Sequence, residues 1–322
     1  VNTCDDNICI GDRAGYNISG ATGTITDGRN IAIGRLSSAG SNNSGTQNIS
    51  IGDESLFNGS SGDNNVAIGQ QTLYAATSAA MNVIVGKMAG TAITDGLRNI
   101  AIGYAAMLAS TSPDDCICLG DRAGRAILGN HNIALGSMAM YGSSSGVNNI
   151  CIGQSAFYSG GTGSNNIAIG LNSMFTYSTS GQHNVSVGYR SNYAAEGGSY
   201  NVGIGADTNF VNRGGNKNIA IGYGAGPTTG QTGQHQRLYI SSSGAAQFTS
   251  SFIYGNMSIT PKTLTFNANV GIGTATPSHP LTVNSYNTTT SGSGMTGWYY
   301  SSSHGNTNWG VGNPYVSIKS SQ

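Results

Sequence analysis

Charged side chains are scarce in this sequence. Only 8% of the 322 residues are charged, and 13 Lys and Arg balance 13 Asp and Glu. Nucleic-acid and membrane-surface binders need clustered Lys and Arg, so this composition argues against both kinds of partner. No apolar run is long enough to span a bilayer, so we expect no membrane insertion. A surface built mainly from Ser, Thr, Asn and Gly favours a location on a virion or outside the cell.

Residues that commonly build catalytic and metal sites are also few. The five histidines lie in no recognisable nucleophile motif, and the five cysteines are an odd number without zinc-type spacing. No Lys-Ser/Thr follows the glycine-rich stretches, which argues against a phosphate-binding loop. We therefore expect no cofactor, no metal site and no catalytic residue, and we expect a protein that is not an enzyme. The cysteines are Cys4, Cys9, Cys116, Cys118 and Cys151.

Glycine, by contrast, is abundant and marks an internal repeat. A five-residue pattern recurs: Asn, an aliphatic residue, a small residue, a second aliphatic residue and Gly. Its closing glycines fall at 11, 34, 52, 69, 86, 103, 120, 136, 153, 170, 188, 205 and 222, so every interval after the first is 16 to 18 residues. Such regular self-similarity is typical of a solenoid. Clear copies are Asn30-Ile31-Ala32-Ile33-Gly34, Asn65-Val66-Ala67-Ile68-Gly69, Asn99-Ile100-Ala101-Ile102-Gly103, Asn166-Ile167-Ala168-Ile169-Gly170 and Asn218-Ile219-Ala220-Ile221-Gly222.

Each position of the pattern has a physical interpretation. The two aliphatic residues share one face of a strand and the small residue takes the other. We expect stacked coils to hold the aliphatic ladder inside and to present the ladder of Ala, Ser or Cys outside, where another backbone can approach. Glycine supplies the corner, and Asn tolerates turns and can stack into amide ladders. A second, looser strand after each glycine is expected to close the other wall of the coil with its bulky residues. Examples are Glu54-Ser55-Leu56-Phe57, Gln71-Thr72-Leu73-Tyr74, Ala106-Met107-Leu108, Ser155-Ala156-Phe157-Tyr158 and Ser173-Met174-Phe175.

These patterns predict an all-β protein, a parallel β-solenoid (β-roll) of about thirteen 17-residue coils, followed by a short β-rich C-terminal region. One thin roll buries few large side chains for the conformational entropy that it loses, so a single copy should be marginal. Association along the small-residue face would bury more surface. We therefore expect a homotrimer.

The Asn-Ile/Val-Ala-Ile-Gly units resemble the head repeats of trimeric autotransporter adhesins. The resemblance covers about residues 5–226, and it departs in period because those adhesin repeats are usually shorter. It implies a left-handed parallel β-roll in a trimer. It also keeps open a microbial cell-surface adhesin, or the subunit of an extracellular filament.

The sequence predicts three regions: a solenoid over 1–226, a β-rich connector over 227–268 and a C-terminal β region over 269–322. The last region contains Asn269-Val270-Gly271-Ile272-Gly273 followed by Pro280-Leu281-Thr282-Val283. This order is similar to the segment before the intramolecular chaperone domain of viral and phage tail-fibre proteins. That resemblance implies a trimer assembled by a C-terminal chaperone that is cleaved off, and we favour a matured virion fibre.

The expected function is a structural fibre that attaches to a host or cell surface, through glycans or another receptor. Aromatic rings beside Ser and Asn can stack on sugars, which makes the C-terminal aromatic residues candidate carbohydrate contacts or, alternatively, a plug at the end of the trimer. A tailspike-type polysaccharide depolymerase is a further alternative. It would use two carboxylates, such as Asp53 with Glu54 or Asp12 with Asp121. The candidate carbohydrate contacts are Trp298, Tyr299, Tyr300 and Trp309.

Overall fold

The structure is a computed structural model of the whole chain. It divides into two compact units, residues 1–267 and 268–322. Each unit is described by itself. The residues described are 6–16, 28–40, 44–58, 61–142, 145–159, 161–176, 180–194, 197–209, 214–227, 233–242, 253–258, 262–266, 268, 270–272 and 281–283.

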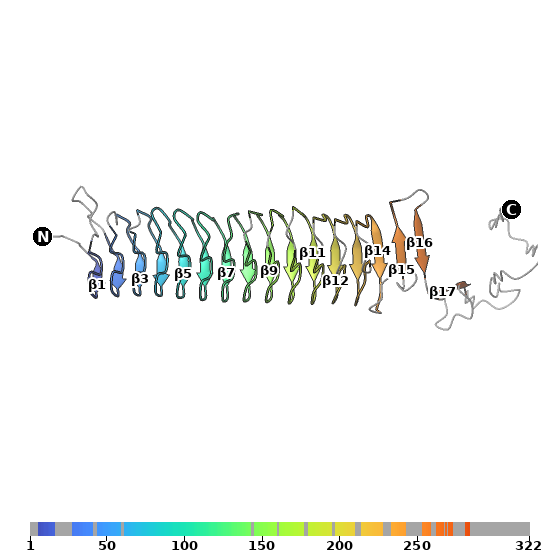
Figure 1. The fold of residues 1–322 in the computed structure, drawn as a ribbon, viewed down its shortest axis with the longest axis horizontal. Helices are drawn as coiled ribbons and strands as arrows, with labels where there is room; N and C mark the ends of the chain where they lie inside the picture. The colour runs from blue at the N-terminus through green and yellow to red at the C-terminus, as the bar shows by residue number, and fades with distance from the viewer. Residues whose placement is uncertain are drawn as a thin grey trace, which may run out of the picture. The chain divides into compact units, whose positions relative to one another are not determined.

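Thirteen three-residue strands of the first unit pair side by side in one parallel sheet, each with its neighbours in sequence (Figure 1). The register is constant: the middle residue of each strand always pairs with the middle residue of the next, as Ala101 does with Cys118. This constancy follows from the regular repeat, and it confirms the predicted parallel β-solenoid. The strands are β1 Ile8–Ile10, β2 Ile31–Ile33, β3 Ile49–Ile51, β4 Val66–Ile68, β5 Val83–Val85, β6 Ile100–Ile102, β7 Ile117–Leu119, β8 Ile133–Leu135, β9 Ile150–Ile152, β10 Ile167–Ile169, β11 Val185–Val187, β12 Val202–Ile204 and β13 Ile219–Ile221.

The sheet changes direction after the repeat. β14 (Arg237–Ile240) still pairs in parallel with β13, whereas β15 (Ile253–Asn256) and β16 (Thr263–Phe266) continue it as an antiparallel meander. Tyr239 takes the slot that Ala220 holds in β13 and is fully buried. The larger ring fills the interior where the repeat ends. In the second unit, β17 (Val270–Ile272) and β18 (Leu281–Val283) form a separate parallel pair.

The two faces of each repeat strand are the reverse of the prediction. The middle, small residue points into the coil, and Ala32, Ala67 and Ala101 have no exposed surface. The aliphatic residues on either side point outward, and Ile102 keeps 42% of its surface exposed. The expectation of an internal aliphatic ladder is therefore wrong. Strand alternation puts the two aliphatics on one face but does not say which face is inside.

The interior is too thin for large residues from both walls, which is why the strand contributes small ones. Bulky residues of the opposite wall fill the space, and Leu73 and Met107 are fully buried. One strand has a bulky residue, Ile84, at its inward middle position. In that coil the opposite wall carries Gly90 where other coils carry Leu73 or Met107, so a small residue faces the large one. A β-carbon on Gly90 would lie 3.2 Å from the Ile84 side chain. Volume is therefore shared across the coil, as close packing requires.

The wall after each glycine is not the second strand that the sequence predicted. It consists of turns in which alternate residues adopt left-handed backbone, as Gln71 and Leu73 do at φ 56° and 47°. This backbone still bonds between coils, because the Gln71 amide donates to Asp53 and the Leu73 amide donates to Ala89. The expected role of the bulky residues is nevertheless confirmed, since Leu56, Phe157 and Met174 also line the interior with no exposed surface. The prediction of a second strand was wrong because a run of turns can form the same hydrogen bonds between coils as a strand would.

The repeat asparagines form a buried ladder along the solenoid. The Asn82 carbonyl oxygen accepts from the backbone and side-chain nitrogens of Asn99 at 2.9 and 3.0 Å. The Asn82 amide nitrogen donates to Asn65 of the preceding coil and to the carbonyl of Gly96. The predicted amide ladder is thus present, and it lies inside the coil with the small residues. Each rung also fixes the returning turn to the strand.

Candidate functional site

One surface feature runs along the whole repeat: the outward face of β1–β13, which we call the aliphatic face. It carries two Ile, Val or Leu side chains from each of thirteen strands, twenty-six in all. The most exposed of them keep 36–57% of their surface open. At roughly 60 Å² of open apolar surface each, the face presents on the order of 1,500 Å². The largest apolar patch on an ordinary monomer is about 300–600 Å², so this face has the size of an interaction surface.

Two rows of residues border the aliphatic face along its length. The leading column consists of the residue just before each ladder position, from Asp6 to Lys217, and the trailing column consists of the residue just after each corner glycine, from Asp12 to Tyr223. Most members of both columns are exposed. These columns hold much of the charge of the solenoid and several tyrosines, so they form a polar and aromatic rim around an apolar centre. That arrangement is common in protein–protein interfaces.

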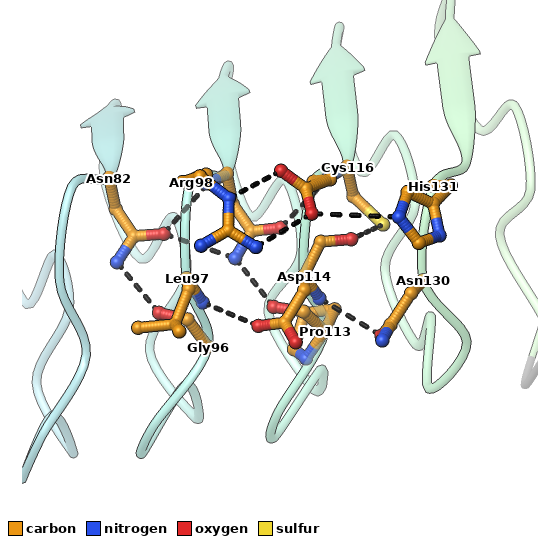
Figure 2. A network of polar contacts seen from close by, with 11 residues as sticks. Asn82, Gly96, Leu97, Arg98, Pro113, Asp114, Cys116, Asn130 and His131 are labelled. Atoms are coloured by element: carbon orange, nitrogen blue, oxygen red, sulfur yellow. Dashed lines mark hydrogen bonds and ion pairs between the residues drawn. The ribbon is translucent and has the colours of Figure 1, made fainter.

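Charges within the leading column pair along the chain of coils (Figure 2). Arg98 binds Asp115 of the next coil at 2.7 and 2.8 Å, and His131 of the following coil lies 3.6 Å from the same carboxylate. The hydrogen bond from Arg98 lowers the pKa of Asp115, and the same hydrogen bond raises the pKa of Arg98. Beside them, the Asp114 carboxylate accepts from the Leu97 amide. These contacts are solvated and fix the register of the turns.

Cys116 interrupts the asparagine ladder in the middle of this network (Figure 2). Its backbone amide donates to Asn99 as an asparagine would, but its sulfur makes weak contacts of 3.4 Å, with the carbonyls of Asp114 and Gly129 and with the Asn132 amide. Burial raises the pKa of the Cys116 thiol to about 11, and burial also raises the pKa values of Cys118 and Cys151. All three thiols therefore stay protonated at neutral pH, which does not suit a nucleophile or a metal ligand.

Restoring the ladder is expected to stabilise the protein. In Cys116→Asn the new amide can accept from Asn132 and donate to Gly129, replacing weak sulfur contacts by ordinary hydrogen bonds. The expected gain is about 1 kcal/mol in the free energy of unfolding, measured by urea denaturation. The matched control is Cys118→Asn, which puts an amide into the apolar interior and should lower stability by about 2 kcal/mol. A loss of stability in both variants would contradict this account of the ladder.

The structure places the two acid pairs considered for a depolymerase differently. Asp12 and Asp121 follow β1 and β7, which are six positions apart in the sheet. Asp53 and Glu54 are both held by Arg35, at 2.8 and 3.3 Å.

Among the described residues no group of three or more His, Cys, Asp and Glu side chains is arranged to hold a metal ion. The described part of the chain also has no helix with the length and apolar character needed to cross a membrane.

Aromatic residues of the turn wall stack on one another along the solenoid. Tyr141, Tyr158, Phe175 and Tyr193 form a continuous stack with centroids 4.8–5.1 Å apart, and Arg125 covers the free face of Tyr141. The ring faces that cover each other are closed to a sugar ring, so the stack contributes to the packing of the turn wall. The predicted carbohydrate contacts Trp298, Tyr299, Tyr300 and Trp309 lie outside the described residues.

The ladder of small residues, which was predicted to lie on the outside and to form the association face, lies inside the coil. A signal for the correct side was present: Asn and the small residue are two positions apart, so they share a face. An inward Asn ladder therefore requires an inward Ala. Paired serines give a second signal, because Ser50 and Ser186 of the strands accompany Ser37 and Ser173 of the turn wall, with which they make buried hydrogen bonds.

Comparison with family models, with curated proteins and with solved structures finds no match to this chain.

Proposed function

We propose that this chain is a subunit of a structural fibre in which copies associate through the aliphatic face, as a homotrimer, and that the fibre attaches to a host or cell surface. One observation carries the proposal: the outward Ile, Val and Leu side chains continue without interruption along all thirteen parallel strands. A small ligand would need a local pocket with convergent polar groups. A uniform face at the rise of a β-sheet suits an equally long partner.

A second copy of the chain is such a partner. The face extends over about 60 Å, at about 4.8 Å for each coil. Only a partner with the same rise keeps its side chains in step with these rows, and another copy has that rise by construction. The open apolar area also exceeds the roughly 800 Å² that each partner contributes to a typical stable interface. The proposed trimer axis therefore runs along the aliphatic face, in place of the small-residue face expected from the sequence.

The number of copies determines how the fibre would act at a surface. Parallel rods present the same turn loops several times, so weak contacts with glycans gain strength through multivalency. A microbial adhesin or an extracellular filament uses the same rod and is the alternative function. Binding of the intact oligomer to a panel of immobilised surface glycans tests attachment. Binding to none of them, and to no intact cell, would contradict the attachment role and leave self-association standing.

Charge on the aliphatic face is expected to separate the copies without unfolding them. In Ile102→Glu combined with Ile152→Glu, two carboxylates replace outward residues that are 42% and 36% exposed, so the coil interior is untouched. Light scattering should give the mass of the homotrimer for the unaltered protein and of one chain for the variant, with an unchanged β-sheet circular dichroism spectrum. The control is Leu128→Glu, which is 47% exposed but lies outside the strands, in the segment that leads from one coil to the next. A single-chain mass for the unaltered protein would refute the proposal.

A further inference from the structure

The charges that border the aliphatic face carry information about how the copies are arranged. This inference rests on the proposed self-association. If copies lie parallel around an axis along the solenoid, the leading column of one copy lies beside the trailing column of the next. If they lie antiparallel, the leading column of one copy lies beside the leading column of the other, and the two trailing columns likewise lie side by side. The order of charges in the two columns therefore distinguishes the orientations and the relative height of the copies.

Parallel copies with the ends of the same strand at one level would bring like charges together. At three coils, the leading residue of one copy would face a trailing residue of like charge in the next copy. At no coil would the two residues carry opposite charges. The like pairs are Asp6 with Asp12, Arg29 with Arg35 and Asp115 with Asp121. Like charges directly opposite one another destabilise an interface.

Advancing the trailing column by one coil toward the C-terminus removes all of these conflicts. Three opposite-charge pairs arise and no like pair remains. The pairs are Asp6 with Arg35, Arg29 with Asp53 and Arg98 with Asp121. The step of about 4.8 Å between coils is small enough for these long side chains to span.

Other arrangements match less well. Moving the trailing column one coil the other way gives one opposite-charge pair, Arg29 with Asp12, but also one like pair, Arg98 with Lys87. Advancing it by two coils gives no opposite-charge pair and sets Asp6 against Asp53. In an antiparallel pair that overlaps along all thirteen strands, Asp6 would face Lys217 at each end. At the middle coil, however, Asp115 would face the second copy's Asp115 and Asp121 would face the second copy's Asp121.

The uncharged border residues fit the same one-coil advance. It places Met81, which is 48% exposed, beside Tyr104, which is 44% exposed. It also places Tyr200 beside Tyr223, which are 55% and 54% exposed. Sulfur–aromatic and aromatic–aromatic contacts are both favourable, and all four side chains are open to solvent in a single copy.

We propose that the copies pack in parallel, with the leading column of one copy against the trailing column of the next, advanced by one coil. The contact is a heterologous one. If the two ends of each strand differ in height along the solenoid axis by the rise of one coil, copies at the same height make this contact and close into a ring. If the two ends lie at the same height, each copy is shifted along the axis relative to the last, and the contact builds a helical filament. The neighbouring side chains are the same in both assemblies.

Disulfide trapping tests this register. The test protein carries Met81→Cys and Tyr104→Cys, together with Cys4→Ala and Cys9→Ala, so that its remaining native cysteines are the buried Cys116, Cys118 and Cys151. Within one chain these positions lie at opposite ends of the strands, roughly 20 Å apart, so no bond can form between them there. The matched control combines Met81→Cys with Lys87→Cys, which are at the same level. A second test pair, Tyr200→Cys with Tyr223→Cys, probes another part of the face.

Oxidation of either test pair is expected to shift the protein from the mass of one chain to that of the whole oligomer on a non-reducing denaturing gel. The same-level control should stay mainly at the mass of one chain. Preferential bonding of the control pair, or bonding of Met81→Cys alone between copies, would overturn the proposed register. Light scattering before oxidation tests self-association separately from the one-coil register. A monomer there would refute self-association itself, whereas an oligomer with the wrong crosslinks would refute only the register.

Discussion

Gly103→Ala is expected to lower the free energy of unfolding by about 4 kcal/mol. Gly103 has φ of +138°, a region that residues with a β-carbon rarely adopt. A β-carbon there would also lie 2.3 Å from the carbonyl oxygen of Gly120 in the next coil. That oxygen belongs to the backbone at the same corner, so it cannot move without displacing the stacked coils. Urea denaturation followed by circular dichroism, at one protein concentration, measures the loss.

The control for this variant is Gly214→Ala. Gly214 also has positive φ, at +71°, but nothing lies within 4 Å of the position of its β-carbon. Only the backbone cost of the left-handed region remains, so the loss should be about 1 kcal/mol. Equal losses in the two variants would mean that the stacked corner contributes nothing beyond the dihedral angle.

Asn82→Leu is expected to cost about 3–5 kcal/mol of stability. The change removes the acceptor of the Asn99 backbone amide and the donor to the Gly96 carbonyl, both of which are buried. Leucine is close to asparagine in size, so the loss reports hydrogen bonding more than packing. The urea midpoint and the slope of the transition give the change in stability.

Asn82→Cys provides a graded comparison, because the chain itself carries cysteine in this slot at Cys116. The sulfur can keep weak contacts of the kind seen there, so the loss should fall between zero and that of Asn82→Leu. A larger loss for Asn82→Cys than for Asn82→Leu would contradict a role for the ladder as a chain of hydrogen bonds. Light scattering at each step confirms that the oligomeric state has not changed.

Much of the solenoid could be predicted from the repeat itself. The positions of the strands, the corner glycines and the asparagine ladder all follow from residues that recur at fixed spacing, because each position must satisfy the same contacts in every coil. The candidate site could be predicted only in part. The residues of the aliphatic face were identified, but Ile31 and Ile33 were assigned to the interior and Ala32 to the surface.

That error has a physical cause. A tripeptide such as Ile100-Ala101-Ile102 satisfies the strand pattern equally well with either face inward. The usual preference of isoleucine for the interior favours the wrong choice. The second error, the strand expected at Gln71-Thr72-Leu73-Tyr74, arose because alternating left-handed turns can bond to neighbouring coils as a strand does. A single coil of sequence does not reveal such a backbone.

The sequence by itself determined the repeat, its parallel register and the positions where only glycine or asparagine fits, since these depend on local geometry that is the same in every coil. Only the tertiary structure decided which face is buried. That choice depends on how much volume the opposite wall supplies, as Leu73 and Met107 show, and the two walls meet only after the chain has turned back on itself. Once those bulky residues fill the narrow interior, the larger strand residues have no room inside, and the aliphatic face becomes the outer surface.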